Sequence, residues 1–346
     1  MVGRKRKSRK KKKPSAAPIF LLVLTVALLT VGVGAWAVLA PFGPAQETFV
    51  EVPNGSSTVR IGQLLEAAGV VRTQYAFELV RFWKRGALRA GEYRFDRQAT
   101  VSDVYSRIAH GDVFTRTVTI PEGSTLFDVA ARLEQAGLGP RKDFLDVAAQ
   151  QTSLVADLDP GAATLEGYLF PDTYHFARKA TPEQICATMV RRFRNIAAQL
   201  GLDQHVHNIV TLASLVERET AVESERPIVA SVFEKRLAKN MPLMTDPAVI
   251  YGLEREGRWR GTIYKSDLVY DTAYNTYLHK GLPPGPIANP GVKSLRAAMD
   301  PAHTDYLYFV AAGANPQGHS VFSADLKQQN ENVAGYRHAV RRAGGR

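Results

Sequence analysis

Cysteine is almost absent from this chain, and its scarcity excludes several kinds of site. Cys186 is the only cysteine in 346 residues, so the chain has no internal disulfide, no zinc site built on several thiolates and no Cys-x-x-Cys redox motif. It lies in PEQICATMVRRF, a pattern typical of an amphipathic helix, and we expect a buried structural thiol. The folded part must therefore depend on its hydrophobic core.

Three common catalytic signatures are also missing. The sequence contains no His-Glu-x-x-His zinc motif, no Gly-x-Ser-x-Gly nucleophile elbow and no Gly-x-x-x-x-Gly-Lys phosphate loop. The closely spaced pair His205 and His207 is two residues apart, and such side chains on a helix point away from each other. We therefore predict no metal site and no cofactor.

Net positive charge is small outside one short segment. The formal net charge is +11, and nine of these charges are arginines and lysines between residues 4 and 13. The rest of the chain is nearly neutral, which gives no indication of a face for nucleic acid. A nuclear-localisation or nucleic-acid role for the basic run itself is the rival interpretation.

A long apolar segment follows the basic run directly. Residues 18–40, PIFLLVLTVALLTVGVGAWAVLA, carry no charged side chain. At ~1.5 Å per residue such a segment is long enough to cross a hydrocarbon core of ~30 Å, and it is too long for a secretory signal. Basic residues before it and Glu47 and Glu51 after it predict a single-pass inner-membrane protein with a cytoplasmic amino terminus and an extracytoplasmic remainder.

An internal repeat follows the apolar segment. VPNGSSTVRIGQLLEAAGV at 52–70 and IPEGSTLFDVAARLEQAGL at 120–138 align without gaps at an offset of 68. Each copy predicts a strand, a Pro-x-Gly turn, a Ser or Thr helix start, an amphipathic helix and a terminating glycine. Such units are similar to LysM-type modules, which bind cell-wall glycan; a purely structural spacer is the alternative.

The predicted fold class is α+β. We expect a basic cytoplasmic tail at 1–17, a transmembrane helix at 18–40, a stalk at 41–51, a small LysM-like α+β region at 52–142 and a larger α+β catalytic domain at 143–346.

The stretch LASLVERETAV, residues 212–222, places two carboxylates on a largely apolar helix. At about 100° per residue, Glu217 and Glu219 lie on opposite flanks of the buried face. Glu219 has Leu212 and Leu215 as helical neighbours, an apolar setting that raises a carboxyl pKa, as a general acid needs. Glu217 borders smaller residues such as Ser214. Periodicity alone does not choose between them, and both remain open as ordinary surface glutamates.

Six motifs in order along the chain resemble the MltG-type (YceG-like) endolytic murein transglycosylases. They are EGYLFPDTY at 166–174, ASLVERETAV at 213–222, ERPIVASVFEKRL at 225–237, LMTDPAVIYG at 243–252, TAYNTYLHKGLPPGPIANPG at 272–291 and YLYFVA at 306–311. The resemblance places the catalytic glutamate of the family on Glu219. It also implies endolytic action in the periplasmic or extracytoplasmic space and association with peptidoglycan synthases.

The resemblance implies cleavage of the β-1,4 bond between N-acetylmuramic acid and N-acetylglucosamine in peptidoglycan. One carboxyl protonates the leaving oxygen and then, as carboxylate, takes the proton of the C6 hydroxyl, which closes a 1,6-anhydro ring. Ordinary glycosidases need two carboxylates, about 5–9.5 Å apart. A single glutamate on an apolar helix suits a reaction in which the sugar supplies its own nucleophile.

Other motif residues are candidate sugar contacts, because tyrosines stack on sugar faces and carboxylates accept hydroxyl hydrogen bonds. The candidates are Glu166, Tyr168, Asp172, Tyr174, Glu217, Thr245, Asp246, Tyr274, Asn275 and Tyr277. Each group has a structural alternative: a core turn around 169–172, a helix start at 245–247 with Asp as its cap, and a loop scaffold at 274–277.

Two positions depart from the family pattern. Met244 stands where the family usually has glutamine, and Gln329 stands where histidine is frequent. Both affect substrate contacts rather than the proposed acid. Two other function classes remain: a non-catalytic wall-binding scaffold, and a conventional muramidase in which Asp246 or Glu166 activates water.

Overall fold

The computed structural model describes residues 17–314 and 318–344. The chain forms two compact units, Met1–Phe114 (unit 1) and Thr115–Arg346 (unit 2). Nearly all of the basic tail predicted at 1–17 lies outside the described residues. Helices and antiparallel strand pairs occur in both units, which confirms the mixed helix-and-sheet class.

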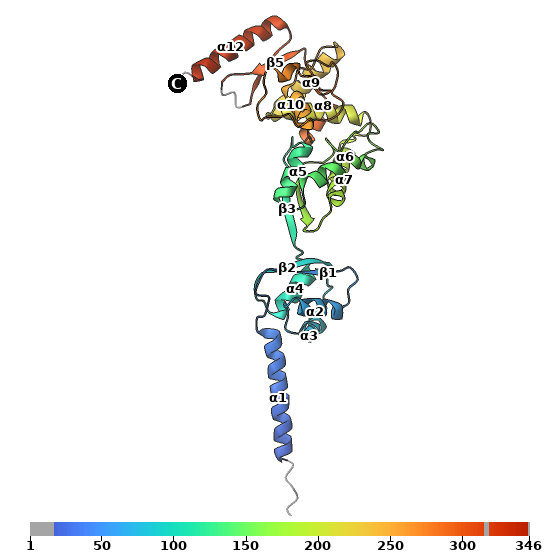
Figure 1. Ribbon diagram of the computed structural model, residues 1–346, viewed down its shortest axis with the longest axis vertical. Helices are drawn as coiled ribbons and strands as arrows, with labels where there is room; N and C mark the ends of the chain where they lie inside the picture. Colours follow the sequence, from blue (N-terminus) through green and yellow to red (C-terminus); the bar gives the residue numbers. More distant parts are fainter. Residues whose placement is uncertain (1–16, 315–317, 345–346) are drawn as a thin grey trace, which may run out of the picture. The chain divides into compact units, whose positions relative to one another are not determined.

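Unit 1 begins with a long apolar helix and continues as a small α+β body. Its elements in chain order are α1 (Ala17–Leu39), β1 (Thr48–Val52), α2 (Thr58–Ala67), α3 (Gln74–Lys84), β2 (Gly91–Phe95) and α4 (Val101–His110) (Figure 1). β1 and β2 pair antiparallel, with Thr48 opposite Phe95. Alternate strand residues point into a core that α2, α3 and α4 cover from one side.

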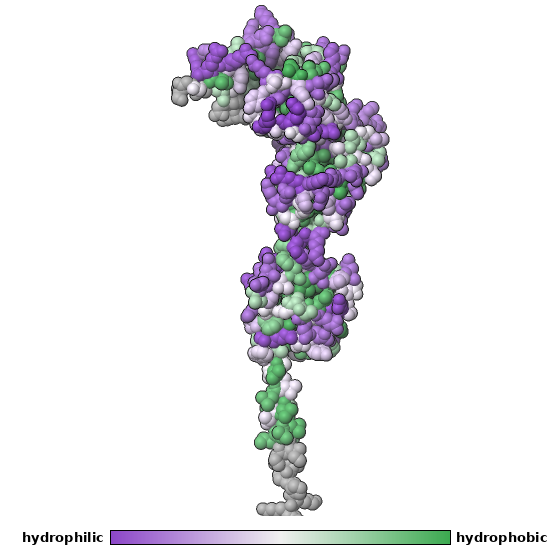
Figure 2. All heavy atoms as spheres, in the orientation of Figure 1, coloured by the Kyte–Doolittle hydropathy of each residue, from purple (hydrophilic) through white to green (hydrophobic). Residues whose placement is uncertain are grey.

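The side chains of α1 are exposed and apolar along the helix, as Figure 2 shows by its green colour above the grey residues. By length and composition, Phe20–Leu39 can cross a membrane. A helix that is apolar all round and packs against little protein needs an apolar environment. The structure therefore agrees with membrane anchoring at the level of this one helix.

Unit 2 is larger and mainly helical. Its elements are β3 (Thr115–Thr119), α5 (Leu126–Gln135), α6 (Arg141–Gln150), β4 (Thr173–Ala177), α7 (Pro182–Leu200), α8 (Val206–Glu219), α9 (Arg226–Ala238), α10 (Asp246–Arg255), α11 (Val292–Met299), β5 (Tyr308–Ala311), β6 (Ser320–Ser323) and α12 (Leu326–Gly344), with short 3-10 turns at Thr152–Leu154, Glu223–Glu225 and Asp267–Val269. β3 pairs antiparallel with β4, and β5 with β6.

The two copies of the repeat fold alike. Each copy supplies the turn and first helix of a unit made of a strand, two helices and a returning antiparallel strand: β1, α2, α3, β2 in unit 1 and β3, α5, α6, β4 in unit 2. Gly55 and Gly123 both have φ +75°, which only glycine adopts easily, and Ser56 and Ser124 both donate to the carbonyl three residues before, at 2.8 Å. The division at 114/115 places the copies in different units, inside the region 52–142 that the sequence grouped together.

Local signals explain where the helices of unit 2 begin and end. The helix predicted around PEQICATMVRRF is α7, with Thr181 as its cap in a capping box with Gln184, and it ends at Gly201 with φ +69°. α9, α10 and α11 pack around α8, so residues 210–216 are all buried. The last turn of α8 thus emerges from the core, and Glu219 is its final residue.

Candidate functional site

Glu219 lies at the point where α8 leaves the core. Its residue is partly exposed, while the preceding turns of the helix are buried. The next residue, Thr220, is extended with φ −136° and donates its N–H to the carbonyl of Val216, which ends the helix. The carboxyl is thus carried by the last residue of a rigid, packed helix, at the edge of the core.

The surroundings of Glu219 favour its protonated form. Burial, together with the negative charge of Asp246, raises the pKa of this carboxyl to about 7, although Thr245 and Arg236 act in the opposite direction. A group with a pKa near neutrality can both give and take a proton, because both protonation states are populated. No ion pair of Glu219 occurs among the residues that the structure describes.

Thr245 lies beside Glu219 with an uncommitted hydroxyl. Thr245 is buried, its N–H donates to the Thr276 hydroxyl at 3.0 Å, and its own Oγ1 makes no regular hydrogen bond with the described residues. The sequence offered Asp246 as the cap of the following helix; the cap is Thr245, and its side chain makes no capping bond. The hydroxyl therefore remains free to interact with the Glu219 carboxyl and lowers its pKa.

Asp246 and Tyr277 form a second polar pair near Glu219. The Tyr277 hydroxyl donates to Asp246 Oδ1 at 2.6 Å. Burial raises the pKa of Tyr277, and the Asp246 and Glu219 carboxylates raise it further, so the tyrosine stays a donor over the working pH range. The fold brings four of the predicted residues together here: Glu219, Thr245, Asp246 and Tyr277.

Sequence reasoning missed one member of this cluster, Arg236 on α9. Its Nε donates to the carbonyl of Leu307 and its Nη1 to that of Leu243, both at 2.7 Å, and its guanidinium lies 5.3 Å from the ring of Tyr308. The arginine thus joins the segments before β5 and before Thr245, and its charge acts on Glu219. Only its place in the ERPIVASVFEKRL motif marked it; its helical pattern looks like an ordinary surface position.

Glu217 is held quite differently from Glu219. Its side chain is 5% exposed and accepts from Arg226 at 2.8 and 3.3 Å, and the N–H of Gly291 donates to it at 2.9 Å. Arg226 also lies 3.6 Å from Glu122. A carboxylate committed to a buried arginine and a backbone amide is an anchor between segments, so this placement favours a structural role over a sugar contact.

The motif EGYLFPDTY at 166–174 is mostly core. Glu166 is 2% exposed; it accepts from the N–H of Leu126 at 2.8 Å and from Nδ2 of Asn289 at 3.0 Å, and burial raises its pKa to about 8. Tyr168 is fully buried and donates to Asp159, and Tyr174 is buried and donates to the carbonyl of Phe170. These three side chains are placed as scaffold rather than at a surface.

Asp172 and the cluster at 274–275 also have protein partners. Asp172 accepts from the N–H of Thr173 at 2.8 Å and from Arg192 at 2.7 Å, at the part-exposed start of β4. Asn275 is fully buried and donates to the carbonyls of Leu268 and Tyr270, which shapes its own loop. Tyr274 is buried, accepts from Arg255 at 2.9 Å and packs edge-on against Tyr251.

Met244 and Gln329, the two positions that depart from the family pattern, lie in different surroundings. Met244 is 49% exposed and has φ +54°, an uncommon backbone conformation for a residue other than glycine. It directly precedes Thr245, so an exposed side chain of this segment stands next to the cluster. Gln329 on α12 accepts from Ser323 and donates to the carbonyl of Phe309, and so fastens α12 to the β5–β6 pair.

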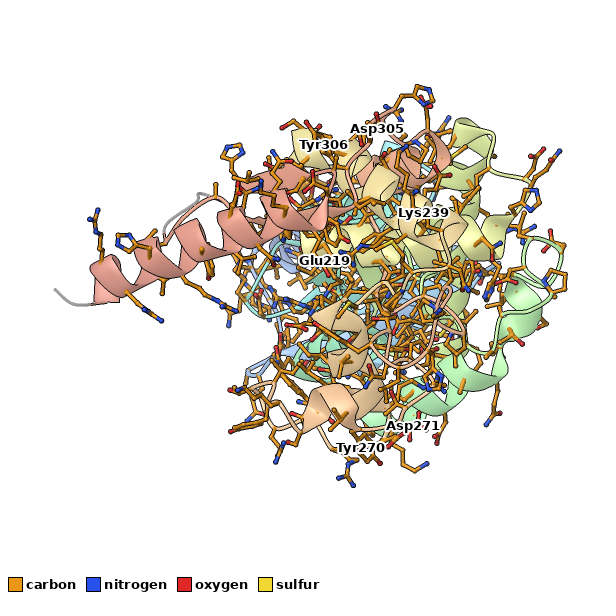
Figure 3. The ribbon with its side chains drawn as sticks, turned by 90° about the horizontal axis from the view of Figure 1, so that it is seen from above. Glu219, Lys239, Tyr270, Asp271, Asp305 and Tyr306 are labelled. Carbon is orange, nitrogen blue, oxygen red and sulfur yellow. The ribbon has the colours of Figure 1, made fainter. Side chains whose placement is uncertain are left out.

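The cluster lies within unit 2 between loops that reach toward solvent. In the view of Figure 3, Glu219 lies between the segment that carries Asp305 and Tyr306 and the loop that carries Tyr270 and Asp271. Among the described residues, no group of three or more histidine, cysteine, aspartate or glutamate side chains is arranged to hold a metal ion. The arrangement as it stands offers acid–base chemistry by one carboxyl, with neighbouring groups that adjust its pKa.

Comparisons with known proteins agree over most of the chain. The model of the YceG-like family matches residues 50–335. A protein of Bacillus subtilis (strain 168) named endolytic murein transglycosylase is 32% identical over 303 residues, 82% of each chain. One of the same name from Streptococcus pneumoniae serotype 2 (strain D39 / NCTC 7466) is 30% identical over 320 residues, 82% of this chain and 57% of that protein. A solved yceG-like protein of Listeria monocytogenes is 32% identical with TM-score 0.54, covering 83% of this chain and 99% of that one. A family match of this extent, with relatives at this identity, means that the chain belongs to the YceG-like family.

Proposed function

We propose that this protein is a peptidoglycan lytic transglycosylase, a lyase that cuts the glycan between N-acetylmuramic acid and N-acetylglucosamine and leaves 1,6-anhydro ends. The relatives named endolytic murein transglycosylase support this activity. The observation that carries it in this chain is Glu219, a single carboxyl at the end of a packed helix. Burial of this carboxyl is the main cause that raises its pKa to about 7.

In this mechanism Glu219 acts twice. Protonated, it gives its proton to the glycosidic oxygen of the leaving N-acetylglucosamine. As carboxylate, it then accepts the proton of the C6 hydroxyl while that oxygen bonds to C1, so the glutamate returns to its starting state. A pKa near 7 serves both steps. In the interval between the two steps, the Thr245 hydroxyl and the Arg236 charge stabilise the carboxylate form of Glu219.

Substitution of Glu219 tests the assignment, with Glu217 as a matched control on the same helix. Glu219→Gln should lower the rate of murein cleavage by about 10²–10⁴-fold, the usual contribution of a general acid–base group, with little change in unfolding temperature. Glu217→Gln should instead destabilise unit 2, by about 3–5 kcal/mol at most, because Arg226 loses its buried partner. Cleavage that persists in a folded Glu219→Gln protein would refute the role.

The products distinguish the proposed reaction from its rivals. Mass spectrometry of digested murein should show anhydro-muramic ends. Hydrated reducing ends would instead support the muramidase, for which Asp246 is the better second carboxylate because it lies near Glu219 while Glu166 is buried. Binding without any products would support the non-catalytic scaffold.

The finer features of the prediction belong to this proposal. We infer that α1 anchors the protein in the cytoplasmic (inner) membrane with its amino terminus inside, since the basic run precedes α1. Endolytic cutting is supported by the names of the relatives, and its action on nascent strands is part of the proposal. Contact of the two strand–helix–helix–strand copies with glycan, in the LysM manner, and association with peptidoglycan synthases complete the proposal. Protease protection of the amino terminus in sealed vesicles checks the orientation.

A further inference from the structure

Helix α3 of unit 1 is apolar on two sides, and only one of them faces the core. Ala76, Phe77 and Val80 are buried. On another side lie Tyr75, Leu79, Phe82 and Trp83, which are 71%, 48%, 67% and 79% exposed. Their spacing of i, i+4, i+7 and i+8 puts them in one row along the helix. We call these four residues the α3 stripe.

Such a row is uncommon on a surface that faces only water. Single exposed apolar residues are normal, but a contiguous group with three aromatic rings marks an interaction surface. Burying the stripe would remove a large apolar area from water, and each Å² of apolar surface buried is favourable by about 25 cal/mol. We therefore ask what occupant covers the α3 stripe.

The position of α3 next to α1 identifies that occupant. The guanidinium of Arg72, just before the cap of α3 at Thr73, lies 3.9 Å from the ring of Trp36 in α1 and 4.6 Å from that of Phe42. α1 and α3 are in contact, and Figure 1 shows α3 on the side of unit 1 from which α1 departs. The stripe is thus close to the level at which the proposed span leaves the hydrocarbon.

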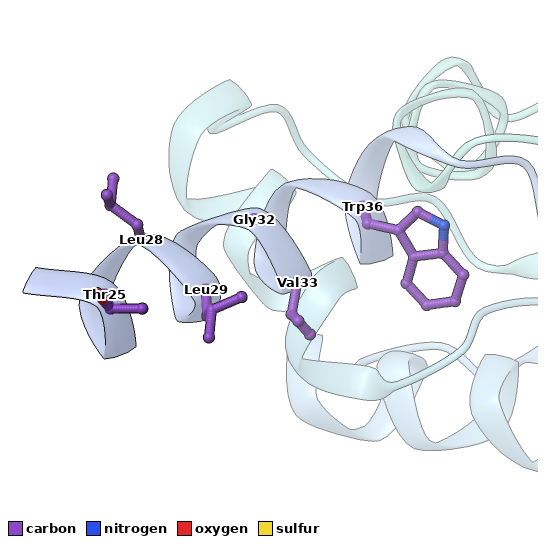
Figure 4. Close-up of a pocket in the computed structure, with 6 residues that line it drawn as sticks. All are labelled: Thr25, Leu28, Leu29, Gly32, Val33 and Trp36. Carbon is purple, nitrogen blue, oxygen red and sulfur yellow. The ribbon is translucent and has the colours of Figure 1, made fainter. Parts of the chain in front are cut away.

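The face of α1 that carries Trp36 is also apolar and exposed. Figure 4 shows a hollow along α1 lined by Thr25, Leu28, Leu29, Gly32, Val33 and Trp36, with Trp36 at the end next to the rest of unit 1. This hollow is formed by one helix and lined by apolar groups, so it suits acyl chains. Trp36 stands where tryptophan is common, at the boundary between hydrocarbon and headgroups.

The charges of α3 complement a lipid surface. Arg85, the C-terminal cap of α3, lies 5.7 Å from the ring of Phe82 in the stripe. Arg81 and Lys84 lie in the last turn, where Lys84 donates to Ser106 of α4, and Glu78 is the lone acidic residue of the helix. Basic residues beside aromatic ones are the combination that binds the interface of a membrane with anionic headgroups. Each such basic residue contributes about 1 kcal/mol near an anionic surface.

We propose that α3 is a second membrane contact: the α3 stripe lies among the headgroups of the leaflet into which α1 emerges. This inference rests on the proposed anchoring by α1, and it is independent of the cleavage reaction. The lipid surface covers the stripe, and unit 1 is held to the membrane at two places instead of hanging from α1 alone.

The chain supplies its own probes for a test. Its three tryptophans are Trp36 in α1, Trp83 in the α3 stripe and Trp259 in unit 2. In each of three full-length variants two tryptophans are replaced by phenylalanine. The variants are reconstituted in vesicles of phosphatidylcholine and phosphatidylglycerol, with or without bromine on the acyl chains near the headgroup, and tryptophan emission is measured.

Bromine should quench Trp36 and Trp83 and leave Trp259 unchanged. Adding Lys84→Glu and Arg85→Glu to the Trp83 variant should weaken its quenching in anionic vesicles. Quenching of Trp36 with an unquenched Trp83 would overturn the proposal, as would a blue-shifted but unquenched Trp83, which indicates a protein on the stripe. An unquenched Trp36 would contradict the membrane anchoring by α1, and the proposal for α3 would fail with it. Murein cleavage is not needed for any of these outcomes.

Discussion

The protonation of Glu219 is set by neighbours of opposite sign. Burial is the largest cause of the upward shift, Asp246 adds to it and Arg236 opposes it, and the resulting pKa of Glu219 is about 7. The acid form is required for the first proton transfer, so kcat/KM should fall above pH 7 by tenfold per pH unit. The charge of each neighbour thus determines where on the pH scale the enzyme loses activity.

Two substitutions should move this alkaline limit in opposite directions. Asp246→Asn removes a negative charge, stabilises the Glu219 carboxylate and moves the limit to lower pH. Arg236→Gln removes a positive charge and moves it to higher pH. The measurement is the pH profile of kcat/KM.

Lys235→Gln is the matched control for Arg236→Gln. Lys235 also lies on α9, but its ion pair is with Asp305 at 3.2 Å, and its replacement should leave the pH profile unchanged. A shift in the same direction for Asp246→Asn and Arg236→Gln would contradict this account of Glu219.

Among the elements, three segments of unit 2 meet at one buried amide. Asn289 accepts from the N–H of Leu169 at 2.9 Å and donates to the carbonyl of Ser124 and to Glu166 at 2.9 and 3.0 Å. Its own N–H and carbonyl pair with Ser124 and Gly123. The loop after α10 is therefore fixed to the start of α5 and to the turn before β4 by a single side chain.

Asn289→Ala should destabilise unit 2 strongly. The change leaves the buried N–H of Leu169 without its acceptor and removes a donor from Glu166, and each such group costs about 1–3 kcal/mol, while the Ser124 carbonyl keeps the N–H of residue 289. The urea midpoint of unit 2 should fall, whereas Asn208→Ala, at an exposed position on α8, should leave it unchanged. Equal stability of the two variants would mean that water or neighbouring groups replace the amide.

On the scale of the whole molecule, the two units have separate hydrophobic cores. The core of unit 1 includes Leu65, Phe77 and Tyr93, and that of unit 2 includes Leu133, Phe193 and Phe233. Leu65 is fully buried, so Leu65→Ala should destabilise unit 1 by about 2–5 kcal/mol. Its thermal transition should move down alone, with the transition of unit 2 and murein cleavage retained. A joint shift of both transitions would show that the units unfold as one.

The sequence predicted those parts of the fold that depend on local signals. The apolar run of α1, the amphipathic pattern of α7 and the two copies of the Pro-x-Gly turn all follow from neighbouring residues. Periodicity placed Glu217 and Glu219 on opposite flanks, and the family resemblance assigned the catalytic role to Glu219. The ion pair and hydrogen bond that hold Glu217 could not be predicted, because Arg226 and Gly291 come from other segments.

Long-range packing decides the remainder of the candidate site. Tyr168, Tyr174 and Asn275 are polar enough to serve as sugar contacts, and only tertiary structure shows that they are buried and bonded to the protein. Arg236 was missed because its partners, Leu307 and Leu243, lie on segments far from α9 or beyond its end. The α3 stripe likewise needs the fold, since its periodicity alone is that of a core helix.

The single thiol of the chain gives unit 2 an internal reporter. Cys186 is buried within α7, and burial raises its pKa to about 12, so a sulfhydryl reagent cannot attack it in the closed state. The rate of its alkylation therefore measures the opening of unit 2 alone, whatever happens to unit 1. The same readout works on protein that has not been purified, where melting curves are out of reach.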